Sequence, residues 1–346
     1  MTFFEEKKNW VEFGQSTGVC TEIMGRLYAD VAQIPTPNVL IGYPIELARY
    51  ASLLAMGMNS HIHLTNPHVI RELYCGPDRK DQVIIGYSGG KDSLAAAIIC
   101  AEAGMHPTLF HIRGLNKSYP NEADLVIEAA EATQFSTIIK SAKLHGKTDY
   151  KENPTKDQLI LAMMVDYGCQ IGINRFSMGI ERTNKLAESN ILYNWSDAFE
   201  MFMAIAPLFQ KVMPAYRWDW HIKNHTHSLK TIVGRDRSLL NHTISCLLPF
   251  RFQASRKEAN EKRFGISLPR NRCGSCWKCC VEYLNLLCLC DDPANDGYAR
   301  HCVKIFLDNI HIAYGDGYKP GATSKELLKS AVDPEFTDMK RLEQYV

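Results

Sequence analysis

The stretch from Val83 to Ser93, with the sequence Val-Ile-Ile-Gly-Tyr-Ser-Gly-Gly-Lys-Asp-Ser, constrains the fold of this chain more than any other. A short apolar run leads into a Ser-Gly-Gly turn, and good helix formers follow over residues 94–101. This order predicts a strand, a tight loop and the first turn of a helix in immediate succession. Backbone N–H groups at a helix start lack intrahelical partners and carry partial positive charge, so the loop is suited to bind an anion.

The loop side chains fit a nucleotide phosphate. Glycines at positions 89 and 90 can adopt positive φ and let the backbone approach a phosphate closely. Two serines supply hydroxyl groups and Lys91 supplies a positive charge, whereas Asp92 is useful beside phosphate when Mg²⁺ is also bound. The residues that we expect to contact the nucleotide are Ser88, Gly89, Gly90, Lys91, Asp92 and Ser93. The alternative is a tight turn in which a Ser or Asp side chain caps the helix.

The string Ser-Gly-Gly-Lys-Asp-Ser resembles the phosphate loop of the PP-loop ATP pyrophosphatase superfamily, whose pattern is Ser-Gly-Gly-x-Asp-Ser. It differs from a Walker A loop, whose Gly-x4-Gly-Lys-Ser/Thr spacing is absent. The resemblance implies an enzyme that uses ATP and Mg²⁺, splits ATP between the α- and β-phosphates, and adenylates a carboxylate or carbonyl oxygen. A nucleophile then displaces the AMP. Lys91 and Asp92 would accordingly be catalytic.

Composition sets the broad class. The chain has 346 residues, 46% of them hydrophobic, which suffices for one large domain or two moderate ones. The formal net charge of +1 argues against a broad nucleic-acid surface but leaves a local basic patch open. Residues 1–8 do not resemble a signal peptide and no apolar run is long enough to cross a membrane. The twelve cysteines therefore predict reduced thiols or metal ligands in the cytoplasm.

From about residue 81, strand-like and helix-like segments alternate. The predicted strands are 83–87, 108–112, 136–139 and 176–179, and the predicted helices are 94–103, 121–133, 157–167 (stopped by Gly168) and 195–212. This alternation predicts an α/β protein with a doubly wound parallel sheet and helices on both faces. We expect a small N-terminal module of open role over 1–80, an ATP-binding domain over 81–245, and a zinc-stiffened C-terminal region over 246–346. The module would hold a strand at 39–43, a helix at 45–58, and a second strand on which His61 and His63 share one face.

Ligands of open parallel sheets bind outside the carboxyl ends of the strands. That rule places His111, Arg113 and Lys140 near the phosphate loop as nucleotide-binding candidates, although each could instead be an ordinary strand-end residue. It also places Glu181–Asn184 there. Glu181 could bind Mg²⁺ or a substrate amine, and Arg182 could bind a phosphate or carboxylate in bidentate fashion. We therefore count both as catalytic candidates.

Cys273, Cys276 and Cys279 form a Cys-x2-Cys-x2-Cys pattern that brings three thiolates to one point. Tetrahedral Zn²⁺ needs a fourth ligand, for which Cys246 is our choice. The alternative fourth ligands are Cys280, Cys288, Cys290 and Cys302. A second interpretation is an iron–sulfur cluster. A tyrosine argues against it, because it stands where the ferredoxin pattern has its fourth cysteine. A third interpretation is that the cysteines are simply buried thiols. A closed four-cysteine zinc site would stiffen the fold near the active site without taking part in the chemistry.

The cysteine pattern is similar to that of 7-cyano-7-deazaguanine synthases, which carry a Ser-Cys element followed by Cys-Gly-x-Cys-x-x-Cys. Residues 153–157 also resemble a Pro-x-Arg-Asn segment of that family, and 178–182 lie where it has its substrate-binding segment. The chain departs from the family in two ways. Its insert over 247–272 is longer, and the family's Tyr-Pro-Asp-Cys-Arg segment is absent, with residues 194–200 in roughly its place. The Gly-x-Glu-Arg-x-Asn pattern is similar to that of an ATP-dependent epimerase acting on a muramoyl-peptide glutamate.

These resemblances imply adenylation of a small-molecule carboxylate, with a 7-deazaguanine acid as the expected substrate, followed by attack of ammonia or an amine. A homodimer or a protein partner would agree with them. The alternatives are an epimerase or a tRNA-modifying enzyme of the same superfamily, an ATP-binding module without catalysis, and a component of an anti-phage defence system that joins a deazaguanine to another molecule.

Three further segments carry weaker expectations. Trp218 and Trp220 flank Asp219, and could stack on a planar base or simply pack; we favour packing. Residues 235–237 are expected to form a solvated loop. A turn-rich linker at 315–321 and a short helix at 324–331 complete the prediction.

Overall fold

The structure is a computed structural model. It describes residues 2–3, 10–13, 79, 81–114, 122–145, 156–181, 202, 206, 210, 213–246, 248, 250–289, 295–309, 332, 335 and 340–345. The strand, helix and histidine pair expected at 39–63 lie outside these residues, as do the linker and helix expected at 315–331 and most of the helix expected at 195–212.

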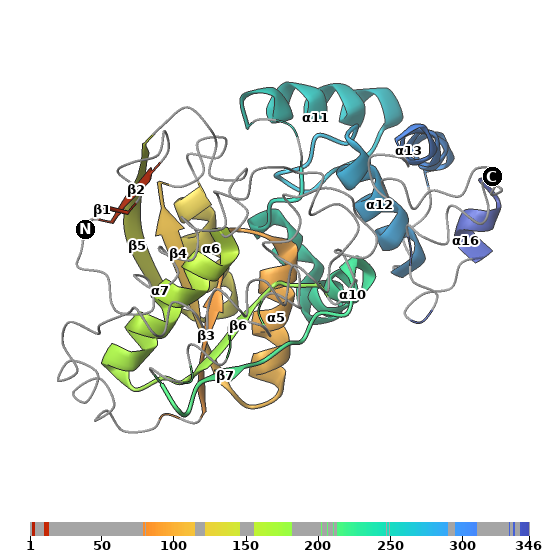
Figure 1. The fold of residues 1–346 in the computed structure, drawn as a ribbon. Coiled ribbons are helices and arrows are strands. Elements are labelled where there is room, and N and C mark those ends of the chain that lie inside the picture. Colours follow the sequence, from red (N-terminus) through yellow and green to blue (C-terminus); the bar gives the residue numbers. More distant parts are fainter. Residues whose placement is uncertain are drawn as a thin grey trace, which may run out of the picture.

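Seven strands form one sheet in the order β1-β2-β5-β4-β3-β6-β7 (Figure 1). Five of them are parallel, namely β3 (Gln82–Gly86), β4 (His106–Arg113), β5 (Ser136–His145), β6 (Arg175–Met178) and β7 (Arg217–Trp218). The predicted α/β class with a parallel sheet is therefore confirmed. Two antiparallel strands from the expected N-terminal module, β1 (Thr2–Phe3) and β2 (Trp10–Phe13), extend the edge of the sheet beyond β5.

The core forms on both faces of β3, whose apolar residues alternate between them. Val83 and Ile85 pack in one core with α5 (Lys91–Glu102) and α6 (Glu122–Thr133). Gly86 lies on the other face, against Met164 of α7 (Lys156–Ile171). The burial on both sides explains why β3 is an almost continuous apolar run rather than an alternating one.

The helix α7 corrects one expected boundary. Gly168 was predicted to end this helix, but the helix continues to Ile171 and is followed by Gly172, whose φ is +77°. The ring of Phe176 lies so close to Gly168 that an added Cβ would be 2.6 Å from it. The glycine at this position thus serves close packing of the helix on β6 and does not act as a stop signal.

Helices dominate the second half of the chain. They comprise α10 (His225–Asp236), the 3-10 helix η3 (Arg237–His242), α11 (Phe250–Phe264), α12 (Trp277–Leu289), α13 (Asp296–Asp308) and α16 (Lys340–Glu343). Two apolar residues of α10 join the core of α5, and Leu286 of α12 reaches the same core. A second core lies between α12, α13 and α16 (Figure 1). Among the described helices, none is both long enough and apolar enough to cross a membrane.

Residues 235–237 are exposed, as expected, but they are helical and do not form a loop. Arg235 and Asp236 end α10, and Arg237 begins η3. The carboxylate of Asp236 accepts a hydrogen bond from the Ser238 N–H at 2.8 Å and so caps the 3-10 helix. A capping aspartate was thus mistaken for a loop residue, because Asp favours both positions.

Candidate functional site

The segment predicted to bind phosphate, residues 88–93 (here called the phosphate loop), leads from the end of β3 into the first turn of α5. Gly89 has a φ of +83°, as its place in the predicted turn suggested. Gly90 does not adopt positive φ; it is the N-cap of α5 with a φ of −73° and a ψ of 142°. An atom added at the Cβ position of Gly90 would meet nothing within 4 Å, so the space beside the start of α5 is open.

The end of β6 lies directly against this loop. The N–H of Gly179 donates to Oγ of Ser93 at 3.2 Å. A Cβ at position 179 would lie 2.2 Å from the Ser93 nitrogen, so the backbones approach too closely for any residue except glycine. Because β3 has β4 on one side and β6 on the other, the two loops meet where the strand order reverses. Such a point is the usual ligand-binding crevice of an open parallel sheet.

Lys91 and Asp92 form an ion pair within the loop. The side chain of Lys91 is only 6% exposed, and its Nζ lies 2.5 Å from Oδ1 of Asp92. Burial alone would raise the pKa of Asp92, but the charge of Lys91, with hydrogen bonds from Lys91 and Ser228, outweighs it and lowers this pKa to about 2. The carboxylate is therefore ionised at neutral pH and the two charges compensate each other.

A third segment joins the loop through His225, the first residue of α10. One ring nitrogen of His225 and one carboxylate oxygen from each of Asp92 and Glu181 all lie within 4.8 Å of one another. Burial, followed by the positive charge of Lys91, holds the pKa of His225 well below its usual range, so the ring is neutral. The structure thus brings together the predicted residues Asp92 and Glu181 with a histidine that was not among the predicted site residues.

His111 lies at the back of the loop. It is 3% exposed, and its Nδ1–H donates to the carbonyl oxygen of Tyr87 at 3.1 Å. Burial lowers the pKa of this histidine. The predicted candidates Arg113 and Lys140 are at the same sheet edge, where Arg113 is exposed and the ammonium of Lys140 lies 4.9 Å from the centre of the Tyr167 ring. The Tyr87 contact favours a structural role for His111 in holding the loop backbone.

The two tryptophans near Asp219 pack, as favoured from the sequence. Trp218 stacks on Phe202 with ring centres 4.6 Å apart. Nε1 of Trp220 donates to the Ile180 carbonyl at 2.9 Å and so holds the residue that precedes Glu181. The predicted site residue Arg182 lies outside the described part of the chain, together with 183–184 and 194–200.

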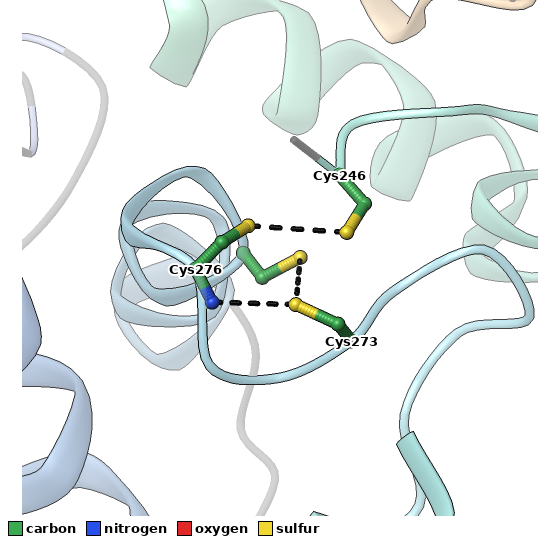
Figure 2. Close-up of side chains that lie close together, drawn as sticks. Cys246, Cys273 and Cys276 are labelled. Atoms are coloured by element: carbon green, nitrogen blue, oxygen red, sulfur yellow. Dashed lines mark hydrogen bonds between the residues drawn. The ribbon is translucent and has the colours of Figure 1, made fainter. Parts of the chain in front are cut away.

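Four cysteines form a compact cluster (Figure 2). The sulfur atoms of Cys246, Cys273, Cys276 and Cys279 all lie within 4.8 Å of one another, and two pairs are 3.9 Å apart. The predicted fourth member, Cys246, is therefore at the cluster, whereas Cys280 and Cys302 pack in the core of α12 and α13. Backbone N–H groups of Ser275 and Cys276 donate to the Cys273 sulfur at 3.4 and 3.3 Å, as they do to metal-bound thiolates. Four thiols with this second shell fit a metal ion such as Zn²⁺.

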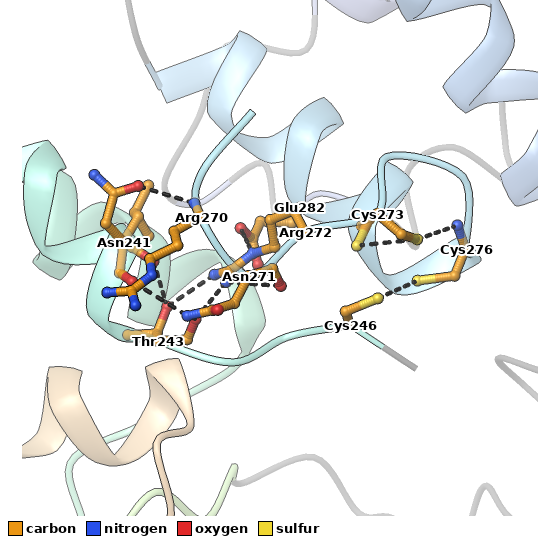
Figure 3. A network of polar contacts seen from close by, with 11 residues as sticks. Asn241, Thr243, Cys246, Arg270, Asn271, Arg272, Cys273, Cys276 and Glu282 are labelled. Carbon is orange, nitrogen blue, oxygen red and sulfur yellow. Dashed lines mark hydrogen bonds and ion pairs between the residues drawn. The ribbon is translucent and has the colours of Figure 1, made fainter. Parts of the chain in front are cut away.

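A buried arginine connects the cluster to its surroundings (Figure 3). Arg272 is 2% exposed; its Nε donates to Glu282 of α12 at 2.6 Å, and its Nη1 and Nη2 donate to the carbonyl and hydroxyl oxygens of Thr243 at 2.5 and 2.8 Å. The next residue, Ile244, donates its N–H to the Gly89 carbonyl at 2.6 Å. A continuous path of hydrogen bonds thus runs from the residue before Cys273 to the phosphate loop.

Neither the known protein-family models nor the curated proteins with which the chain was compared match it. The chemistry of the site therefore has to be argued from its own residues.

Sequence reasoning missed three contributors to this site. His225 follows Asn224, a helix-capping residue whose side chain accepts from the His227 N–H at 2.9 Å. That cap, with apolar residues at 229, 232 and 233, is the signal that could have predicted α10. Gly179 and Thr243 act through the backbone and through a buried arginine, and their roles depend on contacts that have no sequence signature.

Proposed function

We propose that the protein binds ATP at residues 88–93 and transfers AMP to a carboxylate, with release of pyrophosphate. The observation that carries this proposal is the backbone contact between the phosphate loop and Gly179, at the point where the strand order reverses. A doubly wound sheet of the adenine-nucleotide-hydrolase type is consistent with the same strand order, and the resemblance to PP-loop enzymes supplies the reaction.

The loop would act on the phosphates by preorganised charge. The open space beside Gly90 leaves the N–H groups at the start of α5 available to phosphate oxygens. Lys91 would exchange the carboxylate of Asp92 for phosphate, which keeps its buried ammonium compensated. These donors would stabilise the charge that develops on the departing pyrophosphate.

Asp92 and Glu181 are the carboxylates that would hold Mg²⁺, which neutralises triphosphate charge when bound. A carboxylate oxygen of the substrate attacks the α-phosphorus, and the bond from that phosphorus to the bridging oxygen breaks. The resulting acyl-adenylate reacts with ammonia or an amine, and AMP leaves. The adenylate is already a good acyl donor, so the protein need not supply a nucleophile. Arg182 would bind phosphate or carboxylate, and Zn²⁺ in the cysteine cluster would be structural.

The resemblance to 7-cyano-7-deazaguanine synthases makes a 7-deazaguanine acid the expected substrate. The amine would be ammonia or a group carried by another molecule, including a protein, as in the proposed defence role. A cytoplasmic location fits the reduced cysteines, and a homodimer fits the resemblance.

One observation favours a second candidate function, the modification of an RNA base through the same adenylate. The helix α11 lies in the insert between Cys246 and Cys273, at the upper edge of the molecule in Figure 1. Its exposed side chains include Phe252, which is 48% exposed, and four cations: Arg251, Arg256, Lys262 and Arg263. Exposed cations with an aromatic ring suit a single-stranded nucleic acid.

Charge reversal at Arg256 and Lys262 should abolish salt-dependent RNA binding. If the wild-type protein binds no RNA at low salt, this candidate function is removed.

The principal proposal is tested by ATP–pyrophosphate exchange in the presence of 7-carboxy-7-deazaguanine. We expect exchange by the wild type, its loss in Asp92→Asn, and its retention in Asp308→Asn, a matched exposed aspartate at the end of α13 that pairs with Lys304. Equal exchange by the wild type and Asp92→Asn would remove the phosphate loop from the mechanism.

A further inference from the structure

We infer that Asp92, Glu181 and His225 form a binding site for one first-row divalent cation, with Mn²⁺ preferred over Mg²⁺ because one ligand is an imidazole. The inference rests on the proposed function in that it concerns the same nucleotide site. It goes further by adding a ligand from α10 and by naming the class of metal ion.

Three separate segments contribute the ligands. Asp92 comes from the start of α5, Glu181 follows β6, and His225 begins α10. Their ligand atoms lie within 4.8 Å of one another. Two oxygen or nitrogen ligands at about 2.1 Å from a metal ion lie roughly 3 to 4 Å apart, so only a small closing movement is needed.

His225 gives the second, independent observation. Its Nε2 is shut off from solvent and has no hydrogen-bond partner among the described residues. A buried polar atom without a partner is unfavourable, and a cation would satisfy Nε2 in the tautomer that carries its proton on Nδ1.

The ammonium of Lys91 compensates the negative charge of Asp92 when no metal ion is bound. This ammonium lies 2.5 Å from Oδ1 of Asp92 and thus places a positive charge beside the carboxylate. A metal ion must compete with this ammonium until phosphate oxygens draw Lys91 away. The nucleotide and the metal ion should therefore bind cooperatively.

The donor set indicates the class of metal ion. Mg²⁺ prefers an all-oxygen shell, whereas the first-row transition-metal dications, Mn²⁺ included, accept an imidazole nitrogen more readily. Two carboxylates with one imidazole should hence bind Mn²⁺ more tightly than Mg²⁺. Loss of the imidazole should remove this preference and leave an ordinary carboxylate site.

The test is an EPR titration of free Mn²⁺ with the full chain, its cysteine cluster loaded with Zn²⁺, in the absence of ATP. The wild type should bind one Mn²⁺ that Mg²⁺ displaces poorly. His225→Leu should weaken Mn²⁺ binding at least about tenfold, since the loss of a second-shell partner alone costs 10- to 100-fold. Lys91→Met should tighten it. His227→Leu, on the same helix, should leave it unchanged, because its ring accepts a hydrogen bond from the Lys223 N–H instead.

Equal Mn²⁺ affinity in the wild type and His225→Leu would overturn the inference, as would the absence of Mn²⁺ binding in both the wild type and Lys91→Met. Circular dichroism of each variant shows whether a loss reflects unfolding, and Glu181→Gln provides a second ligand variant. ATP–pyrophosphate exchange is scored separately. Exchange without His225-dependent Mn²⁺ binding defeats this inference alone, and His225-dependent binding without exchange defeats the proposed function alone.

Discussion

At the scale of single residues, the Lys91–Asp92 pair dominates the energetics of the loop. The Lys91 side chain is almost entirely buried, whereas the side chain of Asp92 is 25% exposed. Removing one partner from a buried pair leaves the other charge uncompensated, while replacing both by neutral groups can cost little. The burial of Lys91 therefore makes Asp92 important for folding as well as for the proposed chemistry.

Asp92→Asn should therefore lower the free energy of unfolding by roughly 2 kcal/mol, because it leaves the ammonium of Lys91 buried without an anion. The double variant Lys91→Met/Asp92→Asn should recover most of this loss and remain inactive in pyrophosphate exchange. Urea denaturation of both variants measures the difference. Identical stabilities of the wild type and Asp92→Asn would show that the pair contributes nothing to folding.

The pair also predicts a dependence of stability on pH. The pKa of Asp92 falls from the ordinary value of 3.8 to about 2 on folding, so its contribution is fully present above pH 4 and is lost as the pH falls through 2. Linkage puts this contribution at about 2 kcal/mol. The wild type should therefore lose stability relative to Lys91→Met/Asp92→Asn as the pH falls from 4 to 2. A difference that stays constant over this range would contradict the assignment.

At the scale of elements, the contact between β6 and α5 determines whether the site can form. The strands and the first helices were predictable, because buried parallel strands such as 83–87 are unbroken apolar runs between glycines and polar turns. The helix α10 carries a recognisable cap, but its docking could not be predicted, because no local pattern connects its apolar residues to α5. Glu181 could be placed from the strand-end rule, whereas His225 depends on the docking of α10.

Gly179→Ala tests the contact between the two loops. The added methyl group would lie 2.2 Å from the Ser93 nitrogen, so the end of β6 must move away from the phosphate loop. We expect pyrophosphate exchange to fall at least tenfold, which corresponds to about 1.4 kcal/mol, while zinc content stays unchanged.

Gly234→Ala is the matched control, since a methyl group there meets nothing within 4 Å and the residue is helical in α10. It should keep full exchange and gain up to about 1 kcal/mol of stability. Full exchange in Gly179→Ala would mean that the close approach has no functional role.

At the scale of the whole molecule, the cysteine cluster and the phosphate loop are mechanically connected. Arg272 donates to both Thr243 and Glu282 (Figure 3). Ile244, the residue after Thr243, donates its N–H to the carbonyl oxygen of Gly89. Three members of the cysteine cluster could be predicted from their spacing, and Cys246 was chosen as the fourth because the resemblance to 7-cyano-7-deazaguanine synthases includes a Ser-Cys element. The connection could not, because it consists of backbone hydrogen bonds and one buried ion pair between segments that are remote in sequence.

Removal of the metal should therefore weaken ATP binding as well as stability. We expect one zinc per chain by elemental analysis, and its loss in Cys276→Ser together with a lower melting temperature and a weaker affinity for ATP. Cys288→Ser, a half-buried cysteine in α12 away from the cluster, is the control that should retain zinc. Unchanged ATP affinity in the zinc-free variant would separate the cluster from the nucleotide site.

The most direct test of the central claim is a phosphorus NMR measurement of the bond that is broken when the wild-type protein acts on ATP with 7-carboxy-7-deazaguanine and ammonia. Adenylation at the phosphate loop predicts AMP and pyrophosphate in equal amounts. Formation of ADP and inorganic phosphate, or no cleavage with this acid or with a panel of other carboxylates, would contradict it.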